Sequence, residues 1–366
     1  MLSNSQRSSV STACVTAPRQ VSPVDGALPP SLPSLEDQSL ADTSRPAGTV
    51  YTTAGIHPCS SSIFKASHPR HHEDDHSDDE HTPACGPDPS KPILDGEAVD
   101  PARSTAIIRD LAALVGDAAS TTPGGLVALG EFGLDYDRLH YCSREVQLHS
   151  FAAQLRLAAS LSPQLPLFLH SRAAHADFVR LLREAFGPGL ERLERGAVVH
   201  SFTGTVEEMR ELADLGLYIG VNGCGFKTAE NCDVVREIPL DRLMLETDGP
   251  WCEVRPSHEG WKYLVEPKPA VPNGEVAAAA AAVVETEAQG KGRKQGKKNQ
   301  KKEPEVPERF KVVKKEKWQE GAMVKGRNEP CTIERVAKIV AGIKGIPVED
   351  VCEAAWENTA KVFRLD

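Results

Sequence analysis

The sequence predicts a parallel α/β fold, and two observations lead to that prediction. Short apolar runs alternate along the chain with stretches of amphipathic helical periodicity, which is the pattern of strands connected by helices. Four of these runs end on side chains that can bind a metal, namely Glu131, His170, His200 and Asp248. Active sites of parallel α/β enzymes lie at the carboxyl ends of their strands, so we expect these four side chains to meet.

Six apolar runs have the length of a buried parallel strand. They end near Gly55, Gly130, His170, His200, Val221 and Glu246. The first covers residues 50–55 and leads into Gly55-Ile56-His57-Pro58, and the last is the short run 243–245. We expect these six runs to form one sheet.

The stretches between the runs carry signals for helix ends. Asp100 is suited to cap a helix that begins at Pro101, and a second helix follows Ser143. Thr205 and Glu208 have the spacing of a capping box, in a helix that Gly216 stops. Two further helices are expected around residues 333–340 and 351–362. The residues expected to face the core are Ile107, Ile108, Leu111, Leu114 and Val115 in the first helix, Val146, Phe151, Leu155 and Ala159 in the second, and Phe178, Leu181, Leu182 and Phe186 in a third.

Three polar tracts interrupt this pattern. Residues 1–48 are rich in Ser, Pro and Thr and are expected to be disordered or loosely attached, apart from one short strand near residues 12–16. The tracts at about 68–92 and 266–320 are expected to be disordered inserts within a folded region of residues 49–366. The first insert interleaves histidines with acidic residues, and a solvated loop is favoured over a metal site because no secondary-structure period fixes its geometry. The second contains a Lys-rich run at 291–302, for which contact with DNA and a solvated tail both stay open.

Composition excludes several classes of protein. A formal net charge of −10 argues against a protein that coats nucleic acid by bulk attraction. No apolar stretch is long enough to cross a membrane, and no secretory signal is evident. Nine cysteines without a C-x-x-C pair are expected to be ordinary thiols of a reducing compartment, which favours the cytoplasm and leaves the nucleus open. No obligate protein partner is indicated.

The four residues at strand ends form a typical divalent-metal set. One Glu, two His and one Asp suit Zn, Mn or Mg. The alternative for each residue taken alone is that a polar side chain merely ends a strand. Four such ends in succession favour a metal site.

Six short motifs resemble signatures of the TatD family of metal-dependent deoxyribonucleases. They occur in the order in which that family has them, over residues 50 to 366 without the two polar inserts. The motifs are Gly55-Ile56-His57-Pro58, Gly130-Glu131-Phe132-Gly133-Leu134-Asp135-Tyr136, Leu169-His170-Ser171-Arg172, Val199-His200-Ser201-Phe202-Thr203-Gly204, Glu246-Thr247-Asp248-Gly249-Pro250-Trp251 and Arg327-Asn328-Glu329-Pro330. Their details are most similar to the eukaryotic branch.

The resemblance implies a TIM-type barrel of the amidohydrolase superfamily that hydrolyses phosphodiester bonds in DNA. An exonuclease is expected, and endonuclease action stays open as the alternative. The resemblance also implies that Glu131, His170, His200 and Asp248 bind divalent metal ions, expected to be two. Glu131 would bridge the two ions, and Asp248 would also accept a proton from the attacking water. DNA is therefore the expected substrate.

Three further residues are candidates for binding substrate. His57 contacts phosphate or lines the pocket, or else it is a turn residue packed before Pro58. Arg172 holds the scissile phosphate, or else it fixes its loop through a salt bridge. Trp251 stacks on a base, or else it is a buried anchor of its loop.

The chain departs from the family pattern at its front. The pattern opens with a strand carrying Asp-x-His-x-His, whereas this chain has no histidine before His57. Six strands are evident where a closed barrel needs eight. The sequence therefore predicts an incomplete barrel with a truncated or replaced N-terminus. Two alternatives follow, a non-catalytic member with a residual metal site and a superfamily hydrolase of amides or esters, although Glu131 in place of a carboxylated Lys favours the nuclease.

Overall fold

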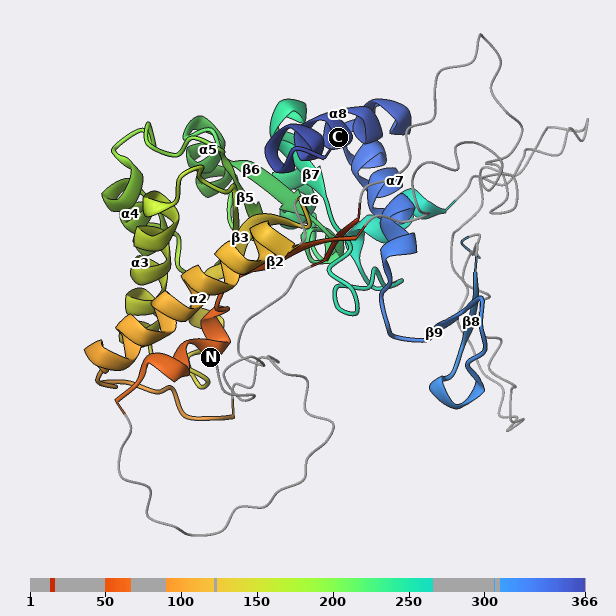
Figure 1. Ribbon diagram of the computed structural model, residues 1–366. Helices are drawn as coiled ribbons and strands as arrows, with labels where there is room; N and C mark the ends of the chain where they lie inside the picture. Colours follow the sequence, from red (N-terminus) through yellow and green to blue (C-terminus); the bar gives the residue numbers. More distant parts are fainter. Residues whose placement is uncertain are drawn as a thin grey trace, which may run out of the picture.

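The computed structural model describes residues 14–16, 50–66, 90–121, 124–265, 306 and 310–365. A seven-stranded sheet lies at its centre (Figure 1). Six strands are parallel and adjacent in chain order: β2 (Val50–Ala54), β3 (Leu126–Asp135), β4 (Leu167–Arg172), β5 (Ala197–His200), β6 (Tyr218–Val221) and β7 (Leu243–Leu245). All six predicted strands are thus present.

The sheet is a curled half-barrel with two edges. A three-residue strand, β1 (Cys14–Thr16), pairs antiparallel with β2 at one edge, and β7 lies at the other. In the described part of the chain β1 and β7 are not paired with each other, so the prediction of an incomplete TIM-type barrel is confirmed. The rest of the tract predicted to be replaced, and most of the two predicted inserts, lie outside the described residues.

Helices connect and cover the strands. The α-helices are α2 (Pro101–Thr121), α3 (Arg144–Ser160), α4 (His175–Phe186), α5 (Val206–Asp214), α6 (Ala229–Glu237), α7 (Ile333–Lys344) and α8 (Val348–Phe363). Short 3-10 helices are η2 (Pro58–Phe64), η3 (Tyr136–Arg138), η4 (Gly223–Phe226), η5 (Leu240–Arg242), η6 (Glu259–Leu264), η7 (Lys315–Lys317) and η8 (Pro330–Thr332). A separate two-stranded parallel sheet pairs β8 (Lys311–Val313) with β9 (Ala322–Val324).

The predicted helix starts are confirmed by their hydrogen bonds. Thr205 and Glu208 form the capping box of α5, and the Ser143 side chain accepts from the backbone N–H of Val146 at the start of α3. Two predicted core positions are wrong, because Leu114 is 38% exposed and Ala159 is also exposed. Leu114 is next to Val115, the residue that α2 buries in this turn, and Ala159 lies in the last turn of α3, beyond its last buried residue Ala158.

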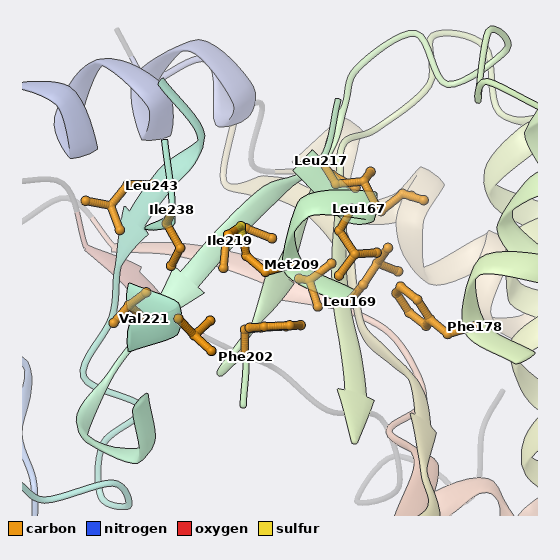
Figure 2. Packing of buried hydrophobic residues seen from close by; sticks show 14 of the residues in the cluster. Leu167, Leu169, Phe178, Phe202, Met209, Leu217, Ile219, Val221, Ile238 and Leu243 are labelled. Carbon is orange, nitrogen blue, oxygen red and sulfur yellow. The ribbon is translucent and has the colours of Figure 1, made fainter. Parts of the chain in front are cut away.

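The outer face of the sheet carries the larger apolar core (Figure 2). Leu167 and Leu169 of β4 and Ile219 of β6 pack there against Phe178 of α4 and Met209 of α5, and all are fully buried. Successive residues of a strand point to opposite faces. The intervening residues of the same strands therefore face the inside of the half-barrel.

The C-terminal residues of the chain cover part of this inner face. Phe168, Val198 and Met244 form one apolar cluster with Phe363 and Leu365, which lie at and just beyond the end of α8. The rings of Phe168 and Phe363 are 6.5 Å apart. Side chains from the end of the chain therefore occupy space that further strands would enclose in a closed barrel.

Cysteine usage differs from expectation at one position. The prediction that every cysteine is a free thiol is wrong for Cys59, which is disulfide-bonded. The free cysteines of the described residues are Cys142, Cys224, Cys232, Cys252, Cys331 and Cys352. None of the helices in the described ranges combines the length and the apolar composition that a membrane span requires.

Two buried glutamines of α3 hold the segments that lead into the carboxyl end of the sheet. Gln147 accepts from the N–H of Asp135 at 2.8 Å and donates to its carbonyl oxygen at 2.9 Å. Gln154, two turns later, accepts from the N–H of Ile56 at 2.8 Å and donates to its carbonyl oxygen at 3.0 Å. Each amide thus pairs with both backbone polar groups of one buried residue, which would otherwise be unsatisfied.

We predict that Gln154→Leu lowers the free energy of unfolding by about 2–5 kcal/mol, because the buried N–H and carbonyl of Ile56 lose their partners. Urea unfolding followed by circular dichroism measures the change. Arg156→Ala, at an exposed position of the same helix, should stay within about 0.5 kcal/mol of the wild type. Equal urea midpoints for Gln154→Leu and the wild type would contradict the assigned role.

Candidate metal centre

Strand register places two histidines side by side at the end of the half-barrel. His170 of β4 and His200 of β5 are paired partners in the sheet, and both are buried. Gly133 of β3 is the partner of His170 on its other side. Its φ is +154°, and a Cβ at this position would lie 1.9 Å from the carbonyl oxygen of His170. Glycine is therefore required for β3 to approach β4 this closely.

The carboxylate of Glu131 lies at the centre of the site. Its Oε1 atom is 2.7 Å from Nδ1 of His170, 3.5 Å from Nε2 of His57 and 3.7 Å from Nε2 of His200. These imidazoles come from the segments after β2 and at the ends of β4 and β5. One carboxylate oxygen of the partly buried Glu131 thus faces ring nitrogens from three separate segments.

Each strand histidine has a second carboxylate behind it. Nε2 of His170 lies 3.0 Å from Oδ2 of Asp135, and Nδ1 of His200 lies 2.8 Å from Oε2 of Glu246. In both cases the other ring nitrogen faces Glu131. A histidine whose outer nitrogen donates to a carboxylate presents its inner lone pair to a metal, an arrangement common in metal sites.

Gly220 makes room for the carboxylate of Glu246. A Cβ at Gly220 would lie 1.9 Å from Oε1 of Glu246, although glycine there has no unusual φ. The same carboxylate accepts from the backbone N–H of Ser201 at 3.1 Å. The position of Glu246 behind His200 therefore depends on the missing side chain of the neighbouring strand β6.

Asp248 lies on the loop after β7, and its carboxylate faces the same ring nitrogen of His200, Nε2, as Glu131 does. Its Oδ1 is 3.7 Å from Nε2 of His200, and its Oδ2 accepts from the thiol of Cys252 at 3.1 Å. The sulfur of Cys224, from η4, is 3.0 Å from that of Cys252. Burial raises the pKa of Asp248, and the nearby carboxylates add to the effect.

The imidazoles and carboxylates of the site shift one another's pKa values. Burial raises the pKa of Glu131, but the surrounding imidazoles, that of His200 foremost, outweigh burial and hold this pKa far below its ordinary value. Burial lowers the pKa of His170 and of His200, but their carboxylate partners outweigh it and raise both values. Each imidazole therefore holds a proton more tightly than a free histidine does, and a divalent cation would compete with that proton.

His57 combines a structural contact with a place in the site. Its Nδ1 accepts from the backbone N–H of Cys59 at 3.2 Å and caps η2, so the turn role is present. Burial is the main reason that its pKa falls to about 4, and the ring is therefore neutral at pH 7. With Nδ1 accepting, the proton of the neutral ring is on Nε2, which faces Glu131. In this tautomer His57 is a donor.

Arg172 and Trp251 lie at the rim. The guanidinium of Arg172 reaches the carbonyl oxygen of Ser201 at 3.5 Å, and its buried Nε has no hydrogen-bond partner among the described residues. No ion pair of Arg172 occurs within the same residues, so the salt-bridge alternative is not observed there. Trp251 is 51% exposed, which disagrees with the alternative of a buried anchor.

The residues present fit a divalent cation. Ligand atoms of His57, Glu131 and His170 all lie within 4.8 Å of one another, and Nε2 of His57 would offer a lone pair to a cation after losing its proton. Imidazole nitrogen and carboxylate oxygen are donors that Zn and Mn accept readily. His200 contacts Glu131 of this cluster, and Asp248 in turn contacts His200, both at 3.7 Å.

Sequence reasoning missed Asp135, Glu246 and the Cys224–Cys252 pair. Asp135 is the last residue of β3 and Glu246 directly follows β7, so both share the strand-end signal that singled out the predicted ligands. Both also lie within motifs already recognised. The contact between Cys224 and Cys252 carried no such signal, because 28 residues separate the two in the sequence.

Comparison with known proteins agrees with this geometry. A family model described as TatD related DNase matches residues 30–364. The Deoxyribonuclease Tat-D of Schizosaccharomyces pombe is 44% identical over 240 residues, which are 66% of this chain and 62% of that protein. The Deoxyribonuclease Tat-D of Saccharomyces cerevisiae is 33% identical over 353 residues, which are 86% of this chain and 74% of that protein. The chain thus spans less than two thirds of the first relative's length.

A solved structure shares the architecture. The crystal structure of an uncharacterized amidohydrolase from Saccharomyces cerevisiae superposes with a TM-score of 0.59 at 29% identity, covering 84% of this chain and 79% of that one. The family match extends over most of the chain and includes every strand end described above. The chain belongs to the family of TatD-related DNases.

Proposed function

We propose that this protein is a metal-dependent deoxyribonuclease that hydrolyses phosphodiester bonds in DNA, in an exonuclease mode. The observation that carries the proposal is the convergence of three imidazoles on Oε1 of Glu131, with Asp248 facing the same nitrogen of His200, Nε2, as Glu131. Family membership supports the choice of substrate. A cytoplasmic or nuclear location stays a prediction from the sequence.

The side chains suggest places for two divalent ions, of Mg, Mn or Zn, one beside Glu131 and His170 and the other beside Nε2 of His200, which Glu131 and Asp248 both face. Such a pair of ions polarises a phosphodiester and lowers the pKa of water. Glu131 lies between the two positions, with His170 on one side and Asp248 on the other. Asp135 and Glu246 would hold the imidazoles of His170 and His200 in the orientation that a cation needs.

Four further roles concern proton transfer and substrate binding. Asp248, whose pKa is raised by burial, would accept the proton of the attacking water through its second oxygen. His57, neutral and carrying its proton on Nε2, would donate a hydrogen bond to a phosphate oxygen. Arg172 would bind the same phosphate with its unsatisfied Nε. Trp251 is exposed at the rim and offers a face on which a base can stack.

We predict that end-labelled single-stranded DNA is cleaved in the presence of Mg or Mn and not in the presence of EDTA. Asp248→Asn and Glu131→Gln should each reduce the rate by about 10²–10⁴-fold, since each removes a charged group from the site. Gel electrophoresis of the products measures the rate. Asp214→Asn, a matched change at an exposed position at the end of α5, should retain full activity. Metal binding without cleavage by the wild type would instead indicate a non-catalytic family member.

We predict that Gly220→Ala lowers metal affinity about 10–100-fold, because the new Cβ displaces Glu246 from its place behind His200. Isothermal titration with Mn measures the affinity, and Glu246→Gln should show a loss of similar size. Gly116→Ala is the matched control, since a Cβ there meets open space on the surface of α2. Unchanged affinity in Gly220→Ala would contradict the role assigned to Glu246.

A further inference from the structure

We propose that a basic cleft beside the metal centre binds the phosphate backbone of the nucleic-acid strand that enters it. The cleft has a volume of about 880 Å³, within the range of binding sites that enclose a ligand. The inference deepens the proposed nuclease function and rests on it for the chemistry. Binding of a strand in this cleft can nevertheless be measured without any cleavage.

Two segments supply most of the lining of the cleft. They are residues 253–257, which follow the loop of Asp248, and residues 323–328, at and beyond β9. Apolar side chains such as Trp261 and Val336 also line it. The charged residues that line the cleft are four cations and one anion, namely Arg255, Lys325, Arg327, Arg335 and Glu253.

Three of the four cations are placed to meet a ligand from solvent. Arg255, Lys325 and Arg327 are exposed, and among the described residues the ion pair of Arg255 is a 4.0 Å contact with Glu253. A solvated guanidinium or ammonium exchanges water for a phosphate oxygen at little desolvation cost. The whole chain has a net charge of −10 and repels a polyanion. A cluster of exposed cations gives this one region a positive potential that attracts it.

One wall of the cleft is fixed directly to the loop of the metal centre. The N–H of Asn328 donates to the carbonyl oxygen of Pro250 at 2.9 Å, and its side-chain amide donates to that of Thr247 at 2.6 Å. Asp248 lies between Thr247 and Pro250 in the sequence. A strand held by Arg327 would therefore lie next to the loop that carries Asp248.

A second cleft flanks the other side of the centre and has the opposite charge. It has a volume of about 670 Å³ and lies between the loops that follow His170 and His200. Its charged lining comprises Arg172 and five carboxylates, those of Asp137, Glu207, Glu208, Glu230 and Asp233. Beyond the one phosphate that Arg172 would bind, a chain of phosphates is repelled by these carboxylates, whereas the basic cleft attracts it. The difference in charge assigns the backbone to the basic cleft.

The test measures binding in EDTA, so that no cleavage occurs. A fluorescein-labelled oligothymidylate of about 12 nucleotides is titrated with the full chain, and fluorescence anisotropy gives Kd at several salt concentrations. The double variant Lys325→Ala/Arg327→Ala should raise Kd about tenfold. It should also reduce the slope of log Kd against log salt by about 1.4, since each lost phosphate contact removes about 0.7.

A control variant separates the cleft from bulk charge. Arg156→Ala/Lys361→Ala removes the same charge from exposed positions on α3 and α8 and should leave Kd and the salt slope unchanged. Thermal melting of both variants checks that each is folded. Equal Kd for the cleft variant and the wild type, an equal loss in the control, or no binding by the wild type would each overturn the proposal. Failure of the nuclease proposal would show separately, as no cleavage of bound DNA by the metal-loaded wild type.

Discussion

The site is organised around one atom of a partly buried carboxylate, Oε1 of Glu131, which lies within 3.7 Å of ring nitrogens from three separate segments. A carboxylate that is largely removed from solvent needs positively charged or hydrogen-bonding partners. Here the partners are imidazoles, which hold the pKa of Glu131 far below its ordinary value. The strands that carry His170 and His200 must therefore end beside β3. Gly133 makes the close approach of β3 to β4 sterically possible, and Gln147 holds the backbone at the end of β3.

The open sheet is compatible with this arrangement because the polar site and the apolar core occupy different ends of the inner face. Phe168 lies two residues before His170 on the same strand face, and its ring is 4.9 Å from that of His200. Below it, Phe363 and Leu365 complete an apolar cluster. The metal centre thus rests on a hydrophobic floor to which the end of the chain contributes.

The strand ends were the part of the molecule that the sequence could predict. Apolar runs and their terminal polar residues are local signals, so the six strands and the meeting of Glu131 with His170 and His200 were predictable. The roles of Asp135 and Glu246 were not, because an acidic residue after a strand looks the same whether it faces a cation or a histidine. The basic cleft was also beyond prediction, since Arg255 and Arg327 come from segments about 70 residues apart in the sequence.

The central claim is that Glu131 and its histidines hold divalent metal. Anomalous X-ray scattering from crystals soaked in Mn tests it most directly. We expect a peak in bonding contact with Glu131 Oε1 and His170 Nδ1, and a second between Glu131 and Asp248 beside His200 Nε2. His170 and His200 should keep their contacts to Asp135 and Glu246. A map without a peak at Glu131, or with Mn bound only elsewhere, would contradict the account.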